Sequence, residues 1–132
     1  MGRIFNHVSV SNPVHPSMHI DVDALVDTGA SALFLPESLR DKLGELEELE
    51  PMHCTLADGS RKQFKRYGPV KVKLEGFLTI YDEVVFLPKA PGGGDVEPLI
   101  GYIILEKCGA AVDMVGHRLL KVDSFDLKGM IS

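Results

Sequence analysis

The stretch Ala24-Leu25-Val26-Asp27-Thr28-Gly29-Ala30-Ser31 decides the fold of this chain. Apolar and polar side chains alternate from Met18 to Val26, which is the period of a β-strand. An acid follows directly, although aspartate is disfavoured in strands and needs water or hydrogen-bond donors. Thr28 adds a hydroxyl, and Gly29 lets another chain or a ligand approach the backbone. Asp27 is therefore a candidate for chemistry, although a strand-ending turn explains these three letters alone equally simply.

Two further motifs lie downstream. Strand-like runs, Met52–Leu56 and Lys62–Arg66, flank Ala57-Asp58-Gly59-Ser60, and Asp-Gly in this setting predicts a hairpin with a type I′ turn. The segment Pro98–Cys108 opens with proline, is apolar nearly all round and is followed by Gly109. This pattern predicts a buried helix.

Short segments between frequent Gly and Pro residues make up the remainder and predict one mainly β domain over residues 1–132. Pro36–Gly44 is expected to form a short helix, Glu45–Glu50 a solvated connection, and Lys89–Glu97 a mobile loop that lacks the GK[ST] of a phosphate site. The further strands expected are Arg3–Val10, Pro69–Leu74, Phe77–Leu87 (interrupted near Asp82), Ala110–Asp113 and Arg118–Val122.

Composition narrows the functional classes. The 132 residues carry 14 Lys and Arg against 19 Asp and Glu, a formal net charge of −5. A mildly acidic chain argues against a nucleic-acid or membrane-surface partner. No run reaches the ~18 apolar residues of a membrane span, and the N-terminus lacks the apolar stretch of a signal peptide. Cys54 and Cys108 have no CxxC spacing, so we expect buried free thiols and a cytoplasmic location.

The order of these motifs resembles the retropepsin-like aspartic proteases, closest to the small single-domain prokaryotic members. The Asp-Thr-Gly-Ala element, the Leu56-Ala57-Asp58-Gly59 hairpin and Pro98-Leu99-Ile100-Gly101 before an apolar helix carry the resemblance, which runs from about Arg3 to Val122. It implies a mainly β, closed barrel-like single lobe with one or two short helices. It also implies a peptide or protein substrate, and neither a metal nor another cofactor.

The resemblance assigns a role to each motif. The chain has one Asp-Thr-Gly, so a second catalytic carboxylate must come from a second copy, with Asp27 facing Asp27 in a homodimer. Thr28, Gly29, Ala30 and Ser31 would form the active-site loop, with Thr28 linking the two copies by reciprocal hydrogen bonds. Leu56 to Ser60 would form the tip of a flap over an extended peptide. Leu99, Ile100 and Gly101 would support the active-site loop, and the C-terminal Phe125–Ser132 would join an interleaved dimer sheet.

Two positions depart from the family pattern. Viral relatives have aspartate where this chain has Ser31, and many relatives have a polar residue where it has Ile103. The first change bears on contacts to the substrate backbone, and the second removes a hydrogen bond that braces the loop. Neither changes the catalytic aspartate.

Other interpretations stay open. A dimeric peptide-binding scaffold of the same fold would need little hydrolysis, and a hydrolase of non-peptide amides or an unrelated β domain is a further alternative. His19, Asp21 and Asp23, with His15 nearby, share a strand face that could bind a metal, but a polar outer face is the simpler explanation. Adjacent His53 and Cys54 would point to opposite faces of a strand, which disfavours a Cys–His nucleophile.

Overall fold

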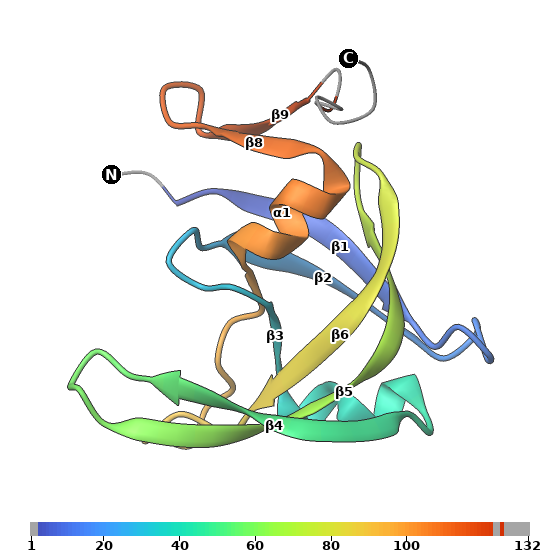
Figure 1. Cartoon of the computed structure of the whole chain (residues 1–132), viewed down its shortest axis with the longest axis vertical. Helices are drawn as coiled ribbons and strands as arrows, with labels where there is room; N and C mark the ends of the chain where they lie inside the picture. The colour runs from blue at the N-terminus through green and yellow to red at the C-terminus, as the bar shows by residue number, and fades with distance from the viewer. Residues whose placement is uncertain (1–2, 123–124, 126–132) are drawn as a thin grey trace, which may run out of the picture.

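The computed structural model describes residues 3–122 and 125, and its strands dominate (Figure 1). It contains nine strands, one 3-10 helix and one α-helix. In chain order they are β1 (Phe5–Ser11), β2 (His19–Val26), β3 (Leu33–Pro36), η1 (Glu37–Leu43), β4 (Glu47–Thr55), β5 (Arg61–Leu74), β6 (Thr79–Leu87), β7 (Leu99–Ile100), α1 (Tyr102–Cys108), β8 (Ala110–Asp113) and β9 (Arg118–Lys121).

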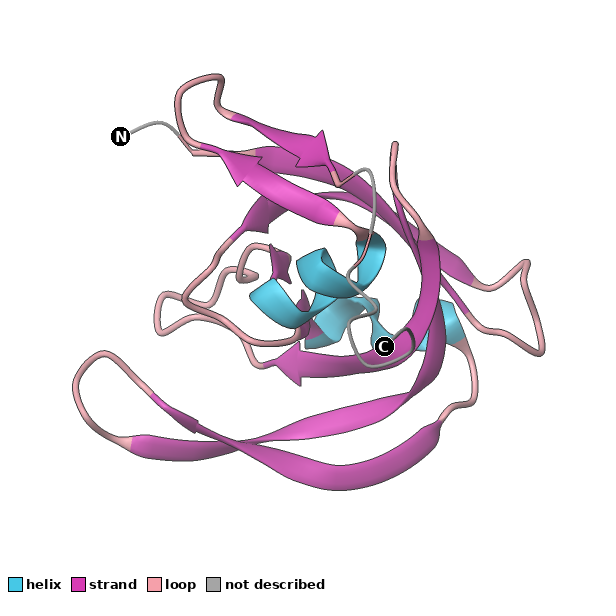
Figure 2. Cartoon of the chain, turned by 45° about the horizontal axis from the view of Figure 1, so that its top comes forward, coloured by secondary structure: helices cyan, strands magenta, loops and turns pink. Residues whose placement is uncertain are grey.

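Seven strands form one sheet in the order β1-β2-β7-β3-β6-β5-β4, and β1 also pairs with β5. The extra pairing closes six strands into a ring and leaves β4 outside it as the free edge (Figure 2). The long strand β5 makes this possible, because its first half pairs with β4 and its second half with β1. A separate two-stranded sheet, β8-β9, follows α1. The predicted mainly β fold with one or two short helices is therefore confirmed, with a ring of strands in its sheet.

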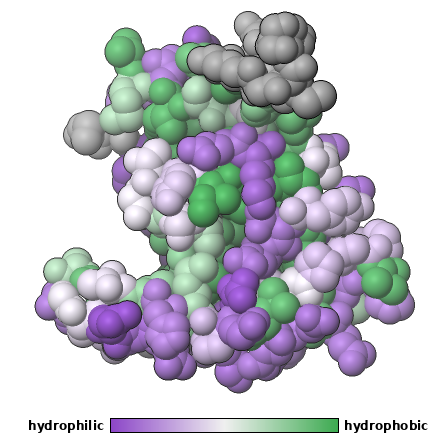
Figure 3. Space-filling view, viewed as in Figure 1, coloured by the Kyte–Doolittle hydropathy of each residue, from purple (hydrophilic) through white to green (hydrophobic). Residues whose placement is uncertain are grey.

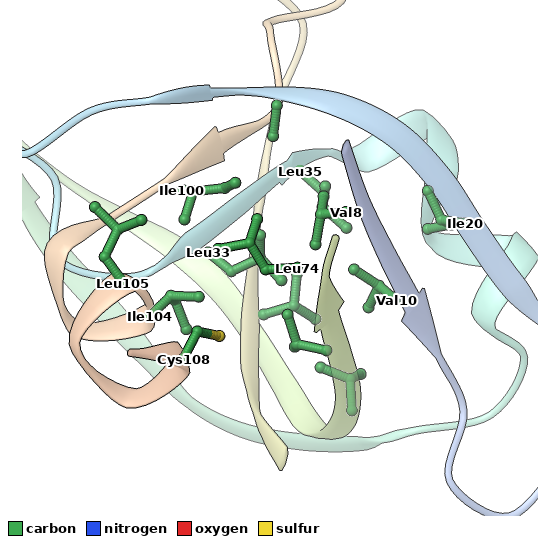
Figure 4. Packing of buried hydrophobic residues seen from close by; sticks show 14 of the residues in the cluster. Val8, Val10, Ile20, Leu33, Leu35, Leu74, Ile100, Ile104, Leu105 and Cys108 are labelled. Atoms are coloured by element: carbon green, nitrogen blue, oxygen red, sulfur yellow. The ribbon is translucent and has the colours of Figure 1, made fainter. Parts of the chain in front are cut away.

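The core fills this ring. In Figure 4, Leu33 of β3, Ile100 of β7 and Ile104 of α1 lie together in it, and all three are almost fully buried. The alternation in β2 is as predicted, since Ile20 and Ala24 are buried while His19, Asp21 and Asp23 are exposed. Burial of such aliphatic side chains contributes about 1.5–3 kcal/mol each. The core thus holds β2, β7 and α1, which carry the candidate motifs, in one rigid unit.

Several predicted boundaries were wrong. The acidic run Glu45–Glu50 is not a solvated connection, since β4 begins at Glu47 and pairs with β5. The two runs expected at Lys62–Arg66 and Pro69–Leu74 are one strand, and β6 passes Asp82 without interruption. The helix expected over Pro98–Cys108 starts only at Tyr102, because the preceding two residues pair as β7 between β2 and β3.

The C-terminal segment Phe125–Ser132, expected in a dimer sheet, lies outside the described residues except for Phe125. In the part of the chain that the structure describes, neither helix has the length or the apolar character needed to span a bilayer.

Candidate active site

The loop after β2 holds Asp27 by short-range hydrogen bonds. The backbone N–H of Gly29 donates to Asp27 Oδ1 at 2.9 Å, and the N–H of Ala30 donates to the Asp27 carbonyl at 3.1 Å. Asp27 is half-buried, whereas Thr28 and Gly29 are exposed. The carboxylate therefore has one oxygen fixed by the backbone, on a loop whose tip faces outward.

Strand β7 and the start of α1 brace this loop from behind. Asp27 N–H donates to the Ile100 carbonyl at 3.0 Å, Gly101 N–H to the Ala32 carbonyl at 2.8 Å, and Tyr102 N–H to the Ala30 carbonyl at 2.9 Å. These bonds join segments about seventy residues apart in the chain. The structure thus places Ile100 and Gly101 of the Leu-Ile-Gly motif against the Asp27 loop.

Gly101 is where the two segments touch. A Cβ atom built on Gly101 would lie 2.5 Å from the Ser31 carbonyl carbon and 2.6 Å from both the backbone N and O of Ala32. No flexible side chain is involved, so only a shift of the backbone could make room. Glycine at this position is what allows the loop and the second motif to pack together.

The hairpin between β4 and β5 has its tip at the predicted place but not with the predicted turn. Only Gly59, with φ 85°, has a positive φ there, whereas a type I′ turn needs two such residues. The Gly59 N–H donates to the Leu56 carbonyl at 2.9 Å, and the Leu56 N–H donates to the Ser60 carbonyl at 2.8 Å. The turn is therefore a longer loop with glycine at its left-handed position.

Asp58 stabilises this tip. Its Oδ1 accepts hydrogen bonds from the Ser60 hydroxyl at 2.6 Å and from the Ser60 N–H at 2.9 Å. These bonds favour the ionised carboxylate, so they lower the pKa of Asp58 below its ordinary value, with a smaller contribution from the charge of Lys62. Asp58 has a local structural role in the hairpin.

A cleft of about 760 Å³ separates the hairpin from the Asp27 loop. In the space-filling view it is the hollow above the hairpin arm at the lower left (Figure 3). Its walls include Asp27, Gly29, Ala30 and Ser31 from one side and Leu56 and Ala57 from the other. One apolar cluster, which packs around the buried residues Ala32 and Val85, contributes seven side chains to the lining: Ala30, Phe34, Met52, Cys54, Phe64, Leu87 and Leu99. The cleft thus joins a fixed carboxylate to an apolar surface of peptide-binding size.

The structure brings most of the predicted residues to this cleft. Of the hairpin tip, Asp58, Gly59 and Ser60 do not line it. Thr28 also lies outside the lining, exposed beside it, while Ile100 and Gly101 act from behind the loop.

Sequence reasoning missed the third wall of the cleft. It is formed by Leu87 and Pro88 and by residues 89–91 and 96 of the segment Lys89–Glu97, for which the sequence predicts only a mobile loop. Two bonds anchor that segment to distant parts of the fold, since Ser38 Oγ donates to Asp95 at 2.9 Å and Arg3 pairs with Glu97. Nothing in the local pattern of three glycines indicates these long-range contacts.

The alternative sites receive little support. His19 Nδ1 lies 2.7 Å from Asp21, and His7, with a pKa raised chiefly by its hydrogen bond to Asp23, lies 3.2 Å from that carboxylate. The described residues include no group of three His, Cys, Asp or Glu side chains placed to hold a metal ion. Burial raises the pKa of the Cys54 thiol, which disfavours the thiolate that a nucleophile requires.

Comparison with known proteins agrees with this geometry. A search of curated proteins finds no match to the chain. A family model described as aspartyl protease matches residues 17–103, which span the Asp27 loop, the hairpin and the Gly101 motif. The match covers well over half of the 132 residues. The chain belongs to the aspartyl protease family.

Proposed function

We propose that the protein is an aspartic endopeptidase of retroviral type that acts as a homodimer, each subunit contributing Asp27. The observation that carries the proposal is the position of Asp27 on a braced loop at the wall of a cleft, where it is the one carboxylate among the lining residues that the structure describes. Hydrolysis by paired carboxylates needs a second acid. A copy related by a two-fold axis supplies it at the equivalent position.

The surface around the loop supports self-association. Thr28 and Gly29 are exposed next to Asp27, and Tyr102 and Ile103, at the start of α1, are 44% and 38% exposed. Large apolar side chains exposed beside a candidate active site are typical of a protein contact. In the proposed dimer, the Thr28 hydroxyls would bond across the axis and hold the two carboxylates together.

The chemistry follows from the proximity of two acids. Two unit charges ~3 Å apart at an effective dielectric constant of ~20 repel by ~5.5 kcal/mol. One proton is therefore shared, as in the aspartic-protease dyad that serves as the standard example of coupled carboxylates. The ionised Asp27 takes a proton from a water molecule, which attacks the peptide carbonyl. The protonated Asp27 of the other copy donates to the carbonyl oxygen, and a proton then passes to the leaving nitrogen.

The hairpin is proposed to act as a flap. An extended peptide in the cleft would run between the Asp27 loop and β4, where backbone groups can bond to it as to an added strand. Residues Leu56 to Ser60 would close over it, and closure would exclude water from the reacting carbonyl.

The test is Asp27→Asn, assayed beside wild type on a diverse peptide library from about pH 3.5 to about pH 7.5. We expect cleavage to fall by about 10³-fold or more, because the variant loses proton transfer at the reacting centre. Asparagine keeps an oxygen that can accept the Gly29 N–H, so the thermal unfolding midpoint and the dimer should be unchanged. Sedimentation equilibrium measures the dimer, and a stable monomer that still cleaves peptides would refute the proposal.

A peptide-binding scaffold is the second candidate. It is favoured by Ile103, which braces the loop only through its backbone N–H, bonded to the Ser31 carbonyl at 3.2 Å. A scaffold would hold peptides equally well with Asp27→Asn, and wild type would cleave no member of the library. An aspartic endopeptidase would cleave some members, and Asp27→Asn would abolish that cleavage.

A further inference from the structure

The cleft carries charge of the opposite sign to the chain as a whole. The chain has a formal net charge of −5, yet Lys62 and Lys89 line the cleft, and within residues 3–122 and 125 Asp27 is the one carboxylate of the lining. A concave site with an excess of one sign of charge attracts ligands of the other sign, and here the two lysines outnumber the carboxylate among the described lining residues. This local reversal points to an acidic group on the ligand.

Lys89 lies on the third wall of the cleft, and the acidic residues near it in the chain are bonded to other groups. Asp95 accepts a hydrogen bond from Ser38 of η1, and Glu97 pairs with Arg3. None of the ion pairs between described residues includes Lys89. Lys89 is thus an exposed residue of the cleft lining, and its charge is available to a ligand.

Lys62 lies in strand β5 of the hairpin and also lines the cleft. Its charge is one of the smaller causes that lower the pKa of Asp58, whose carboxylate is bonded chiefly to Ser60. Lys62 also borders a smaller hollow of about 290 Å³, together with Lys65 of β5 and with Glu37 and Arg40 of η1. The hairpin wall is thus also cationic, but Asp58 offsets part of the charge of Lys62.

Apolar side chains line the same cleft as these two lysines. Phe34, Met52, Phe64 and Leu87 line the cleft and belong to one apolar cluster. We infer that the cleft selects extended peptides in which an acidic side chain neighbours a large apolar one, with Lys89, assisted by Lys62, as the specificity-determining residue. This inference rests on the proposed function, because it names the substrate class of the same cleft.

The test compares three peptides that differ at one position: the acetylated, amidated sequence Ala-Ala-Xaa-Leu-Phe-Ala-Ala with Glu, Gln or Lys as Xaa, each carrying a fluorophore. Fluorescence anisotropy gives the Kd for the Asp27→Asn variant, and wild type gives kcat/KM. An exposed ion pair is expected to make the Glu peptide bind about 3-fold tighter than the Gln peptide and about 10-fold tighter than the Lys peptide. The preference should shrink at about 0.5 M NaCl, because salt screens exposed charges.

Reversing the charge of Lys89 tests whether this residue determines the preference for the Glu peptide. In the Asp27→Asn background, Lys89→Glu should reverse the order of the Glu and Lys peptides. Lys71→Glu is the matched control, because Lys71 is an exposed lysine of β5 that does not line the cleft, and it should leave the order unchanged. Equal Kd values for the three peptides, or an equal effect of the two reversals, would overturn the inference.

The two proposals fail in different ways. A preference for the Glu peptide in binding, with no cleavage of any peptide by wild type, would refute the endopeptidase and support the selectivity. Cleavage of all three peptides at the same kcat/KM would support the endopeptidase and refute the selectivity. Absence of both binding and cleavage would refute both.

Discussion

Two loops border the same cleft and are held in different ways. The Asp27 loop is held by backbone hydrogen bonds to residues outside the loop: Ile100, Gly101 and Tyr102. The hairpin tip from Leu56 to Ser60 is held by bonds among its own residues, in the part of the chain that the structure describes. A fixed loop suits a carboxylate that must meet a reacting atom, and a locally held tip suits a segment that opens and closes.

The fixed loop should be the more sensitive to substitution, and Gly101→Ala tests this most strongly. Its methyl group would press on backbone atoms of Ser31 and Ala32 at 2.5–2.6 Å. We expect a loss of about 3 kcal/mol in the free energy of unfolding, together with loss of activity. Urea denaturation measures the first quantity.

Gly92→Ala is the control for that substitution. Gly92 lies in the 88–97 segment with no atom within 4 Å of a built Cβ. Its replacement should change the free energy of unfolding by less than about 0.5 kcal/mol. If both variants lose the same stability, the close contact at Gly101 does not hold the loop.

The two cysteines allow the same comparison, because Cys108 lies in α1, which braces the Asp27 loop, and Cys54 lies in β4 of the hairpin. Burial raises the pKa of Cys108 in α1 to about 11, from an ordinary 9.0. As pH rises, the unfolded chain loses this thiol proton at a lower pH than the folded chain does. The contribution of the protonated thiol to the free energy of unfolding is therefore fully present below about pH 9 and falls towards pH 11, by roughly 2 kcal/mol. Urea denaturation across this range measures the slope.

Variants of the two cysteines show which thiol causes the fall in the free energy of unfolding with pH. Cys108→Ala should flatten it, whereas Cys54→Ala, in the half-buried hairpin position, should flatten it far less. Iodoacetamide should likewise modify Cys54 in the native protein and Cys108 only after unfolding. Equal labelling rates for the two thiols would mean that α1 is no better packed than the hairpin.

Gly59→Ala tests the hairpin tip. Its φ of 85° is unfavourable for alanine, although a Cβ there would meet no atom within 4 Å. The expected loss of stability is about 1 kcal/mol. Gly76→Ala is matched, since Gly76 has φ 91° and equally open surroundings in a turn away from the cleft. Both variants should lose similar stability, but only Gly59→Ala should raise KM, and equal KM values would argue against a flap.

Local patterns predicted the parts of the fold that local forces determine. The hairpin, the alternation of β2 and the position of Asp27 all follow from neighbouring residues. The acidic run was misassigned because its pairing partners lie far away: Glu48 faces Tyr67 across the β4-β5 ladder, and Tyr67 donates to its carboxylate. Tertiary pairing overrode the local preference of a glutamate-rich segment.

The same reason explains what was missed at the site. The third wall of the cleft, with Lys89, depends on contacts of Asp95 and Glu97 with Ser38 and Arg3, which are distant in the chain. The turn type was missed for a different reason. Asp-Gly suggested two positive φ angles, but Asp58 bonds to Ser60 and keeps an ordinary backbone conformation.

Asp58→Asn should have the smallest effect of these substitutions. It tests whether the order of the hairpin tip depends on pH. Ser60 lowers the pKa of Asp58, so the order that this carboxylate gives the tip is present above its ordinary pKa of 3.8 and is lost as pH falls through the lower folded value. Wild type should therefore show faster amide exchange at Gly59 in strong acid, relative to Gly93 in the 88–97 segment. Asparagine cannot ionise, so the variant should lack this change while keeping the fold. An unchanged acid response in Asp58→Asn would mean that another group controls the tip, leaving the backbone bonds between Leu56 and Ser60 as its main support.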